Sequence, residues 1–377
     1  MLPKNWIPEW FDDWNAQHPT KNLLKPAILV GVGGTAVFAV AMFASWGNPL
    51  PNDSLQTGPR GTGMSVTKLT ANLNTPDPTI ADYYAEAPYE VAADEPLAKD
   101  IYENVQVLGD LTEGNFNRLM NSITLWVAPD QGCVYCHAGA DEGNYAADDL
   151  YTKVVARSMI QMTQVINDDW YGHVNANAEV GVTCYTCHRG QNVPNNIWFR
   201  IAPVNEGVAG WSAVQNRVTA QSQFTSLPSD ALEKYLLEYE PINVHTLQAH
   251  PVGGPSDPGA STWQNTERTY SLMNYFSNAL GRNCVFCHNS RAFYDPAQVT
   301  PQWATASLGI AMVQELNNDW LVPLTDVLPE HRLGPIYADV PKVACKTCHQ
   351  GYQKPLQGLN VIAEYPELAA PGAPVYD

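Results

Sequence analysis

The sequence predicts a mainly α-helical protein with one transmembrane helix near its N-terminus, an internal duplication and long irregular segments. A run of 21 residues without a charge indicates the membrane helix. Two pairs of similar segments, with apolar residues at helical spacing, indicate the duplication. The 29 Pro and 26 Gly, together with only 15% charged residues, favour a chain rich in loops.

Four Cys-x-x-Cys-His motifs contain all eight cysteines of the chain. In this motif two thiols one helical turn apart add to the vinyl groups of a haem, and the adjacent histidine becomes the proximal iron ligand. Zinc or thioredoxin-like sites do not require that histidine four times, and disulfides would leave the four histidines unexplained. The sequence therefore predicts a multihaem cytochrome c with four covalently bound haems. The motif residues are Cys133, Cys136 and His137; Cys184, Cys187 and His188; Cys284, Cys287 and His288; and Cys345, Cys348 and His349.

The uncharged run at residues 26–46 is long enough to span roughly 30 Å of hydrocarbon as a helix. Lys21 and Lys25 precede it and the next basic residue is Arg60, so the positive-inside rule places the N-terminus in the cytoplasm. The haem domain is then expected on the periplasmic side of a bacterial cytoplasmic membrane, where c-type haem is attached. The alternative is a cleaved signal peptide, with residues 39–41 (Ala-Val-Ala) as a cleavage site.

Three tryptophans precede the membrane helix at helical spacing. Trp6, Trp10 and Trp14 recur every four residues, with Phe11 beside them. Indole rings favour the membrane interface, so a short interfacial helix is expected here. Its acidic residues favour contact with a membrane-embedded protein over binding to anionic lipid.

The net charge of −18 argues against nucleic acid as a partner and favours basic or neutral partners. A solvated acidic surface that only maintains solubility explains the same charge.

The duplication defines a two-haem unit. Residues 116–137 resemble residues 270–288, and each of these segments ends in a haem motif. Residues 159–170 resemble residues 309–320, and each of these segments precedes another haem motif. Phe116, Leu119, Ile123 and Trp126 keep helical spacing, as Val154, Met159, Met162 and Ile166 do approximately. The expected divisions are residues 1–25 (cytoplasmic or interfacial), 26–46 (transmembrane), 47–110 (extended), 111–200 (first two-haem unit), 201–262 (connector), 263–355 (second unit) and 356–377 (tail).

Sixth iron ligands are scarce among the histidines. Outside the motifs only His18, His173, His245, His250 and His331 remain, and His18 lies on the cytoplasmic side of the predicted membrane helix. Three methionines on predicted helices lie 13, 22 and 11 residues before the first cysteine of a motif: Met120, Met162 and Met273. A methionine on a helix is more often core packing, but recurrence at matched positions favours ligation, which would raise the haem potentials.

The motifs resemble those of the tetrahaem cytochrome subunits of purple-bacterial photosynthetic reaction centres. The resemblance covers about residues 56–352. It rests on residues 56–64 (QTGPRGTGM), 162–174 (MTQVINDDWYGHV), 181–191 (GVTCYTCHRGQ), 284–291 (CVFCHNSR) and 345–351 (CKTCHQG). Several members of that family are anchored by a lipidated N-terminal cysteine, whereas this chain has a predicted transmembrane helix.

The resemblance implies one set of iron ligands. Three haems in that family have His/Met ligation and the fourth has His/His ligation. In this chain Pro323 aligns with His173 and cannot ligate, while Met312 aligns with Met162 and is an alternative ligand for the fourth haem. The implied pairs are Met120 with His137, Met162 with His188, Met273 with His288, and His173 with His349.

The resemblance also implies electron transfer without bond-making catalysis. Electrons would pass from a soluble cytochrome c or high-potential iron–sulfur protein to the photo-oxidised bacteriochlorophyll special pair. The haem at His137 would be outermost and the haem at His288 nearest the special pair. Implied partners are the reaction-centre L, M and H subunits and the light-harvesting antenna. Four acidic residues near the first motif could steer a basic donor or belong to a solvated loop: Asp141, Glu142, Asp148 and Asp149.

Two other functions fit parts of the sequence. A membrane-anchored tetrahaem quinol dehydrogenase shares the single N-terminal helix and the four motifs, but not the wide motif spacing or the shortage of histidines. A multihaem enzyme would need an open iron with an unusual proximal residue, and all four motifs keep histidine.

Overall fold

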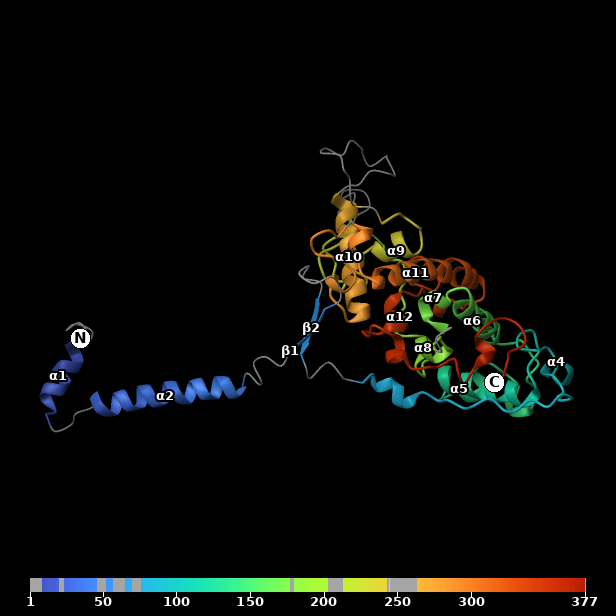
Figure 1. Cartoon of the computed structure of the whole chain (residues 1–377), viewed down its shortest axis with the longest axis horizontal. Helices are drawn as coiled ribbons and strands as arrows, with labels where there is room; N and C mark the ends of the chain where they lie inside the picture. Colours follow the sequence, from blue (N-terminus) through green and yellow to red (C-terminus); the bar gives the residue numbers. More distant parts are fainter. Residues whose placement is uncertain are drawn as a thin grey trace. The chain divides into compact units, whose positions relative to one another are not determined.

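A computed structural model describes residues 9–19, 24–45, 52–56, 65–69, 76–176, 180–202, 213–242, 244, 263–293 and 295–376. The chain divides into two compact units (Figure 1). Unit 1 comprises Met1–Ser54 and Thr67–Thr75, and unit 2 comprises Leu55–Val66 and Pro76–Asp377.

The N-terminal part contains two helices, α1 (Glu9–Gln17) and α2 (Leu24–Ser45). Within α2, Ala27–Ser45 is long and apolar enough to cross a membrane, and it is the one such helix among the described residues. The prediction of a single apolar N-terminal helix is therefore confirmed. Strands β1 (Asn52–Gln56) and β2 (Ser65–Leu69) pair in a two-stranded sheet. Trp6 and most of the 56–64 motif lie outside the described residues.

Helices and short helical turns make up most of the regular structure described in unit 2, as the sequence predicted. The α-helices are α4 (Ala98–Ile101), α5 (Glu113–Val127), α6 (Tyr151–Asp168), α7 (Tyr171–Val174), α8 (Cys184–His188), α9 (Ala231–Leu236), α10 (Trp263–Leu280), α11 (Pro301–Glu315) and α12 (Cys345–His349). A π-helical turn, η8 (Leu316–Leu321), extends α11. The 3₁₀ turns are η1 (Pro78–Asp82), η2 (Gly132–Tyr135), η3 (Ala140–Glu142), η6 (Cys284–Phe286), η7 (Pro296–Gln298), η9 (Val322–Asp326), η10 (Glu330–Arg332), η11 (Pro355–Gly358) and η12 (Pro366–Leu368).

Helices α5 and α6 show how the predicted apolar faces are used. Leu119 and Trp126 are fully buried on α5, as their spacing predicts. On α6 the buried apolar residues are Ile160 and Ile166, whereas Val154 is exposed. The inward face of α6 therefore includes polar residues, and the expectation that Val154 shares this face was wrong.

The long helices pack against the short helices that carry haem motifs. Helix α5 packs on α8, and α10 packs on α12. Figure 1 shows α10 and α4 at opposite ends of unit 2. One apolar cluster joins α9, α10 and α11, and a second joins α5 to the C-terminal segment around Tyr365. The first cluster thus supports two long helices that precede haem motifs, α10 and α11, and the second supports α5.

Candidate haem-binding site

Two of the four motifs form short α-helices with matching ends. In α8 the backbone N–H of Thr183 donates to Oγ1 of Thr186 at 3.0 Å, and in α12 Ala344 donates to Thr347 at the same distance. Both helices end at the motif histidine. The next residue adopts the left-handed conformation in each case: Arg189 (φ 49°) and Gln350 (φ 50°).

The other two motifs form tighter 3₁₀ turns, η2 and η6. A threonine at the start of the following helix binds each turn. Oγ1 of Thr152 donates to the carbonyl oxygen of Tyr135 at 2.5 Å, and Oγ1 of Thr300 donates to that of Phe286 at 2.7 Å. The predicted spacing of about one helical turn between the cysteines holds in all four motifs, although two of them are not α-helical.

All four motif histidines make the same hydrogen bond. Each Nδ1 lies 2.8–3.0 Å from a backbone carbonyl oxygen a few residues farther along the chain. A carbonyl can only accept, so Nδ1 carries the hydrogen and the lone pair of Nε2 is available to a metal. The pairs are His137 with Tyr145, His188 with Gln191, His288 with Phe293, and His349 with Tyr352.

Burial favours the neutral form of three motif histidines, His137, His188 and His349. Desolvation lowers the pKa of His137 and of His188, and it lowers the pKa of His349 to about 4. Neutral imidazole is the form that ligates a metal. Desolvation also raises the pKa of the Cys136 and Cys184 thiols to about 11.

A largely apolar cavity of about 1350 Å³ runs through unit 2. This exceeds the roughly 300–1,000 Å³ of an ordinary small-molecule site. The side-chain oxygen of Gln302, on its wall, is buried with no hydrogen-bond partner in the described part of the chain. An apolar cavity with thiols, imidazoles and a spare polar group fits haem. Its lining includes Met120, Cys133, Cys136, His137, Met162, His173, Cys184, Cys187, His188, Cys287, Met312, Cys345, Cys348 and His349.

His173 lies beside the fourth motif although it belongs to the first predicted unit. Its Nδ1 is 2.8 Å from the carbonyl oxygen of Thr305, and its ring centroid is 6.2 Å from that of His349. Two imidazoles on opposite sides of one metal would have centroids roughly 6 Å apart, given metal–nitrogen bonds of about 2 Å. Met312 is also buried on the cavity wall, so both predicted alternatives lie near this site.

The predicted methionine ligands lie on three long helices: Met120 on α5, Met162 on α6 and Met273 on α10. Met120 and Met162 line the cavity. Met273, with Cys284 and His288 of the third motif, is not part of its lining, and Met273 packs against the cluster of α9, α10 and α11. The structure therefore brings together three of the four predicted sites in one cavity.

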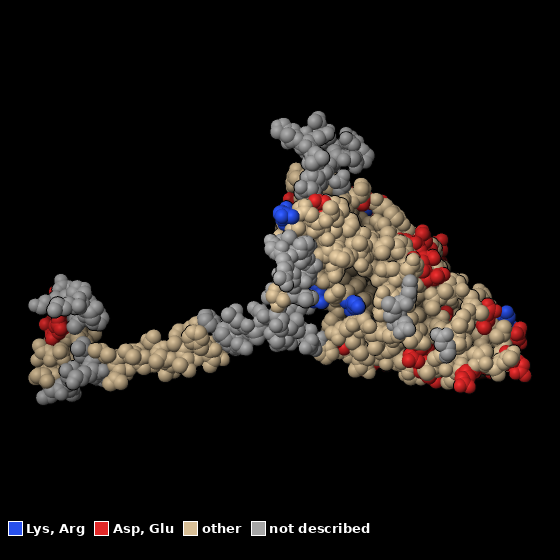
Figure 2. Space-filling view, in the orientation of Figure 1, with Lys and Arg blue, Asp and Glu red and all other residues tan. Residues whose placement is uncertain are grey.

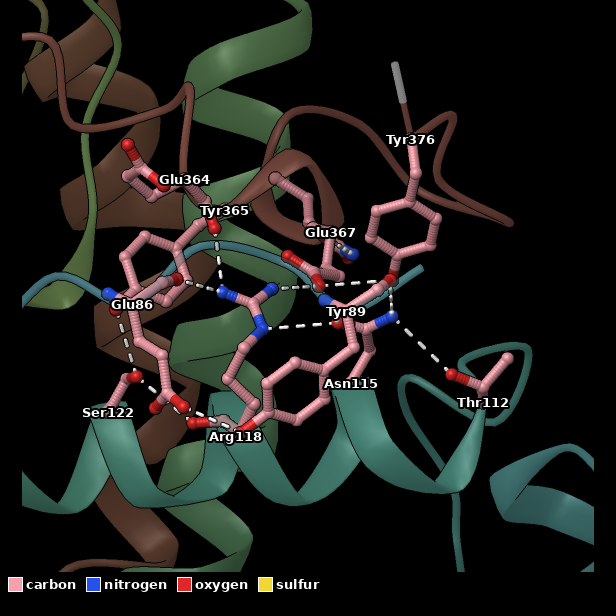
Figure 3. Close-up of polar contacts among 11 residues, drawn as sticks. Glu86, Tyr89, Thr112, Asn115, Arg118, Ser122, Glu364, Tyr365, Glu367 and Tyr376 are labelled. Carbon is pink, nitrogen blue, oxygen red and sulfur yellow. Dashed lines mark hydrogen bonds and ion pairs between the residues drawn. The ribbon is translucent and has the colours of Figure 1, made fainter. Parts of the chain in front are cut away.

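Helix α5, which carries Met120, is held in place by the buried guanidinium of Arg118 (Figure 3). This group forms a fully buried ion pair with Glu367. It also donates to the carbonyl oxygens of Glu86 (2.6 Å) and Glu364 (2.7 Å). The C-terminal segment thus fixes the helix that presents the methionine.

Two buried asparagines that the sequence did not mark as site residues orient the second and fourth motifs (Cys184–His188 and Cys345–His349), called the central motifs below. Asn167 makes two hydrogen bonds with the backbone of Val182, at 2.8 and 2.9 Å. Asn317 makes the same pair with Val343, at 2.9 and 3.0 Å. The repeated NDDW and NNDW segments contained this signal, because the two asparagines occupy matched positions.

The second cysteines of the two central motifs lie together. Cys187 and Cys348 are paired as a disulfide, with their Cα atoms 4.5 Å apart. A sulfur in a disulfide cannot also form a thioether with a haem, so this pairing and the predicted attachment exclude each other for these two residues.

The acidic residues near the first motif and the remaining histidines differ in exposure and in ion pairing. Asp148 forms ion pairs with Lys153 (3.0 Å) and Arg157 (2.9 Å), so its charge is neutralised. Asp141, Glu142 and Asp149 are exposed. His331 lines the cavity, whereas His245 and His250 lie outside the described residues.

Comparison with known proteins agrees with these features. Residues 47–369 match the family model described as photosynthetic reaction centre cytochrome C subunit. A photosynthetic reaction center cytochrome c subunit from Roseobacter denitrificans is 65% identical over 371 residues, covering 98% of this chain and all of that protein. Proteins with the same description from Rubrivivax gelatinosus and Thermochromatium tepidum are 42% and 39% identical. They cover 92% and 93% of this chain, and 92% and 81% of their own lengths.

Proposed function

This chain belongs to the photosynthetic reaction centre cytochrome c subunit family, and we propose that it carries electrons through four haems to the photo-oxidised bacteriochlorophyll special pair. Membership makes it an electron-transfer protein with covalently bound haem, associated with a reaction centre and a membrane. The number of haems, their ligands, the side of the membrane and the individual partners are the proposed parts.

The observation that carries the proposal is the shared hydrogen bond of the four motif histidines. Each Nδ1 is occupied by a carbonyl oxygen, so each Nε2 is left to ligate iron. Every motif has two cysteines to attach the haem. Bound haem supplies a one-electron Fe(III)/Fe(II) couple, and the chain's own residues set its position and its potential.

The proposed sixth ligands are Met120, Met162 and Met273 for the first three motifs in chain order. His173 is proposed for the fourth. The cavity position of Met120 and Met162 supports two of these assignments. The 6.2 Å separation of the His173 and His349 rings supports the fourth, because it suits two imidazoles on one iron.

The duplication of a two-haem unit is supported by hydrogen bonds that occur twice. The Asn167 and Asn317 pairs to the backbone are one example. Another is the N–H of the glycine after each central motif: Gly190 donates to the carbonyl oxygen of Trp126 and Gly351 to that of Ala279. Such matched contacts far apart in the sequence favour descent from one ancestral unit.

The proposed electron path runs from the haem at His137, through those at His188 and His349, to the haem at His288. The short Cα distance between Cys187 and Cys348 supports adjacent central haems. Figure 2 shows acidic side chains gathered over the end of unit 2 that carries α4, α5 and α6. This charge suits a soluble donor with a basic face, a small cytochrome c or a high-potential iron–sulfur protein. Asp148 is not a candidate for steering, because Lys153 and Arg157 neutralise it.

We place the haem domain on the periplasmic side, with the N-terminus in the cytoplasm and α2 in the membrane. Lys21 and Lys25 before the apolar stretch support this orientation. The proposed partners in the membrane are the L, M and H subunits, with the light-harvesting antenna as a neighbour of the N-terminal helices.

Flash spectroscopy on native membranes tests the proposal. With the haems reduced beforehand, the c-type α-band should bleach with the same time course as recovery of the special pair. Absence of flash-induced haem oxidation, combined with haem reduction on addition of quinol, would overturn the proposal in favour of a quinol dehydrogenase.

A further inference from the structure

Gly309 lies directly against the imidazole ring of His173. A Cβ atom at position 309 would lie 2.4 Å from Cε1, 2.9 Å from Nδ1 and 3.0 Å from Nε2 of that ring. Nonbonded carbon atoms prefer about 3.5–4.0 Å, so even a methyl group would displace the ring. Gly309 is inside α11, with no left-handed backbone conformation to require glycine. The absence of a side chain at Gly309 therefore leaves the space that the His173 ring occupies.

One turn of α11 provides both supports of the His173 ring. The carbonyl oxygen of Thr305 accepts the hydrogen bond from Nδ1 at 2.8 Å. Gly309, four residues later on the same helix, lies against the ring itself. Helix α7, which carries His173, packs on α11. The direction of the free Nε2 toward the site at His349 thus depends on this turn.

In the first repeat, the position that aligns with Gly309 carries a large side chain. Met159 aligns with Gly309, and Pro323 aligns with His173. Met159 packs against the apolar cluster of Leu321, Leu324 and Val340. At this position α11 has glycine, and the His173 ring lies against it. At the aligned position α6 has the large side chain of Met159, and Pro323, which aligns with His173, has no imidazole to accommodate.

A second possible ligand lies on the same helix. Met312 is three residues after Gly309, is buried and lines the cavity. It aligns with Met162, the proposed ligand of the second motif. Helix α11 could thus supply a thioether to the haem at His349 if the imidazole were absent.

We infer that Gly309 is a positioning residue that selects His173 over Met312 as the sixth ligand of the haem at His349. The inference rests on the proposed function and adds to it the reason for unequal ligation in the two repeats. Because thioether ligation raises the potential of a haem relative to imidazole ligation, this glycine keeps one haem at lower potential than the others.

The test is Gly309→Ala in the complete reaction-centre complex, with haems attached in the native host. Electron paramagnetic resonance of the oxidised haems should lose the signal of a bis-imidazole haem. Redox titration should show one midpoint potential shifted upward and three unchanged. The matched control is Gly172→Ala, next to His173, where the nearest atom to a Cβ is Cδ1 of Leu308 at 3.6 Å, an ordinary contact. Its spectrum and potentials should equal those of the wild type.

Retention of the bis-imidazole signal and all four potentials in Gly309→Ala would overturn the inference. If Gly309→Ala does not accumulate, the double variant His173→Ala/Gly309→Ala decides. If the double variant accumulates, the defect of Gly309→Ala was a clash with the His173 ring. If the double variant does not accumulate either, Gly309 has a general packing role, which contradicts the inference. Absence of a bis-imidazole signal in the wild type would instead refute the proposed ligation, whatever Gly309 does.

Discussion

The Cα atoms of Cys187 and Cys348 lie 4.5 Å apart although 161 residues separate them in the sequence. They are the second cysteines of α8 and α12, which pack against each other. If both sulfurs carry haem, these two haems are direct neighbours in the electron path.

Peptide mapping of the mature protein should therefore find a haem on the peptide with Cys184 and Cys187 and another on the peptide with Cys345 and Cys348. Thioether formation consumes these thiols, so the Cys187–Cys348 disulfide is expected only in protein made without haem attachment. A disulfide-linked peptide in the mature membrane complex would contradict the attachment of all four haems.

Met273→His should lower the potential of one haem and slow the re-reduction of the special pair. Imidazole stabilises Fe(III) more than a thioether does, and axial ligands control haem potentials over about 0.8 V. A shift on the order of 100 mV is expected in a redox titration. Met273→Leu in the same complex separates loss of the thioether from gain of an imidazole. An unchanged titration of all four haems would reject Met273 as a ligand.

Lys153→Met should lower the potential of the haem at His137. Buried Lys153 donates to the carbonyl oxygen of Tyr145 at 2.9 Å, and the same oxygen accepts from Nδ1 of His137. Without the lysine, this oxygen accepts more strongly from His137, which makes the imidazole a stronger electron donor to iron. One midpoint potential should fall in a redox titration.

The matched control for Lys153→Met is Lys99→Met, which breaks a half-exposed ion pair with Asp110. It should leave every haem potential unchanged and alter stability by less than about 0.5 kcal/mol. Equal effects of the two variants would show that Lys153 acts only through the net charge of the protein.

Arg118→Met should destabilise unit 2 by about 3–5 kcal/mol, because it leaves the carboxylate of Glu367 buried without its partner (Figure 3). Thermal or denaturant unfolding of the purified complex, followed by haem absorption, measures this loss. The double variant Arg118→Met/Glu367→Leu removes both charges and should recover part of it. A double variant no more stable than Arg118→Met would show that hydrogen bonds to the backbone, and not the unpaired charge, cause the loss.

The contact between Asp77 and Arg189 should make stability depend on acidity. Burial raises the pKa of Asp77, but hydrogen bonds from Arg189 and Thr79 outweigh it, so the folded pKa lies below the ordinary 3.8. A lowered folded pKa stabilises the protein above about pH 4, and this contribution is lost as the pH falls through the folded value.

Asp77→Asn should remove this part of the acid dependence and cost about 1–3 kcal/mol near neutral pH. Melting curves of the complex between pH 3 and pH 7 provide the measurement. The melting temperature of the wild type should fall more steeply with acid than that of Asp77→Asn. Equal slopes for the two proteins would rule out this role of the carboxylate.

Much of the site could be predicted from local sequence. The four motifs predict the attaching thiols and the proximal histidines, because attachment chemistry needs them at fixed spacing. The apolar N-terminal helix was predictable for a similar reason, since a membrane span depends on length and composition alone. The inward face of α6 was less predictable, as Val154 shows, because polar contacts such as that of Asn167 replace apolar ones there.

By itself the sequence determined the kind of cofactor and its covalent attachment, and it predicted a repeated order of helices and motifs. The family resemblance already implied that His173 pairs with His349, and the structure places the two rings 6.2 Å apart. Only the tertiary structure showed that Gly309 lies against the His173 ring and that Cys187 lies beside Cys348. These relationships join segments from different halves of the chain. Spacing in a sequence controls distances over a few turns of helix, whereas contacts between distant segments depend on how whole helices pack.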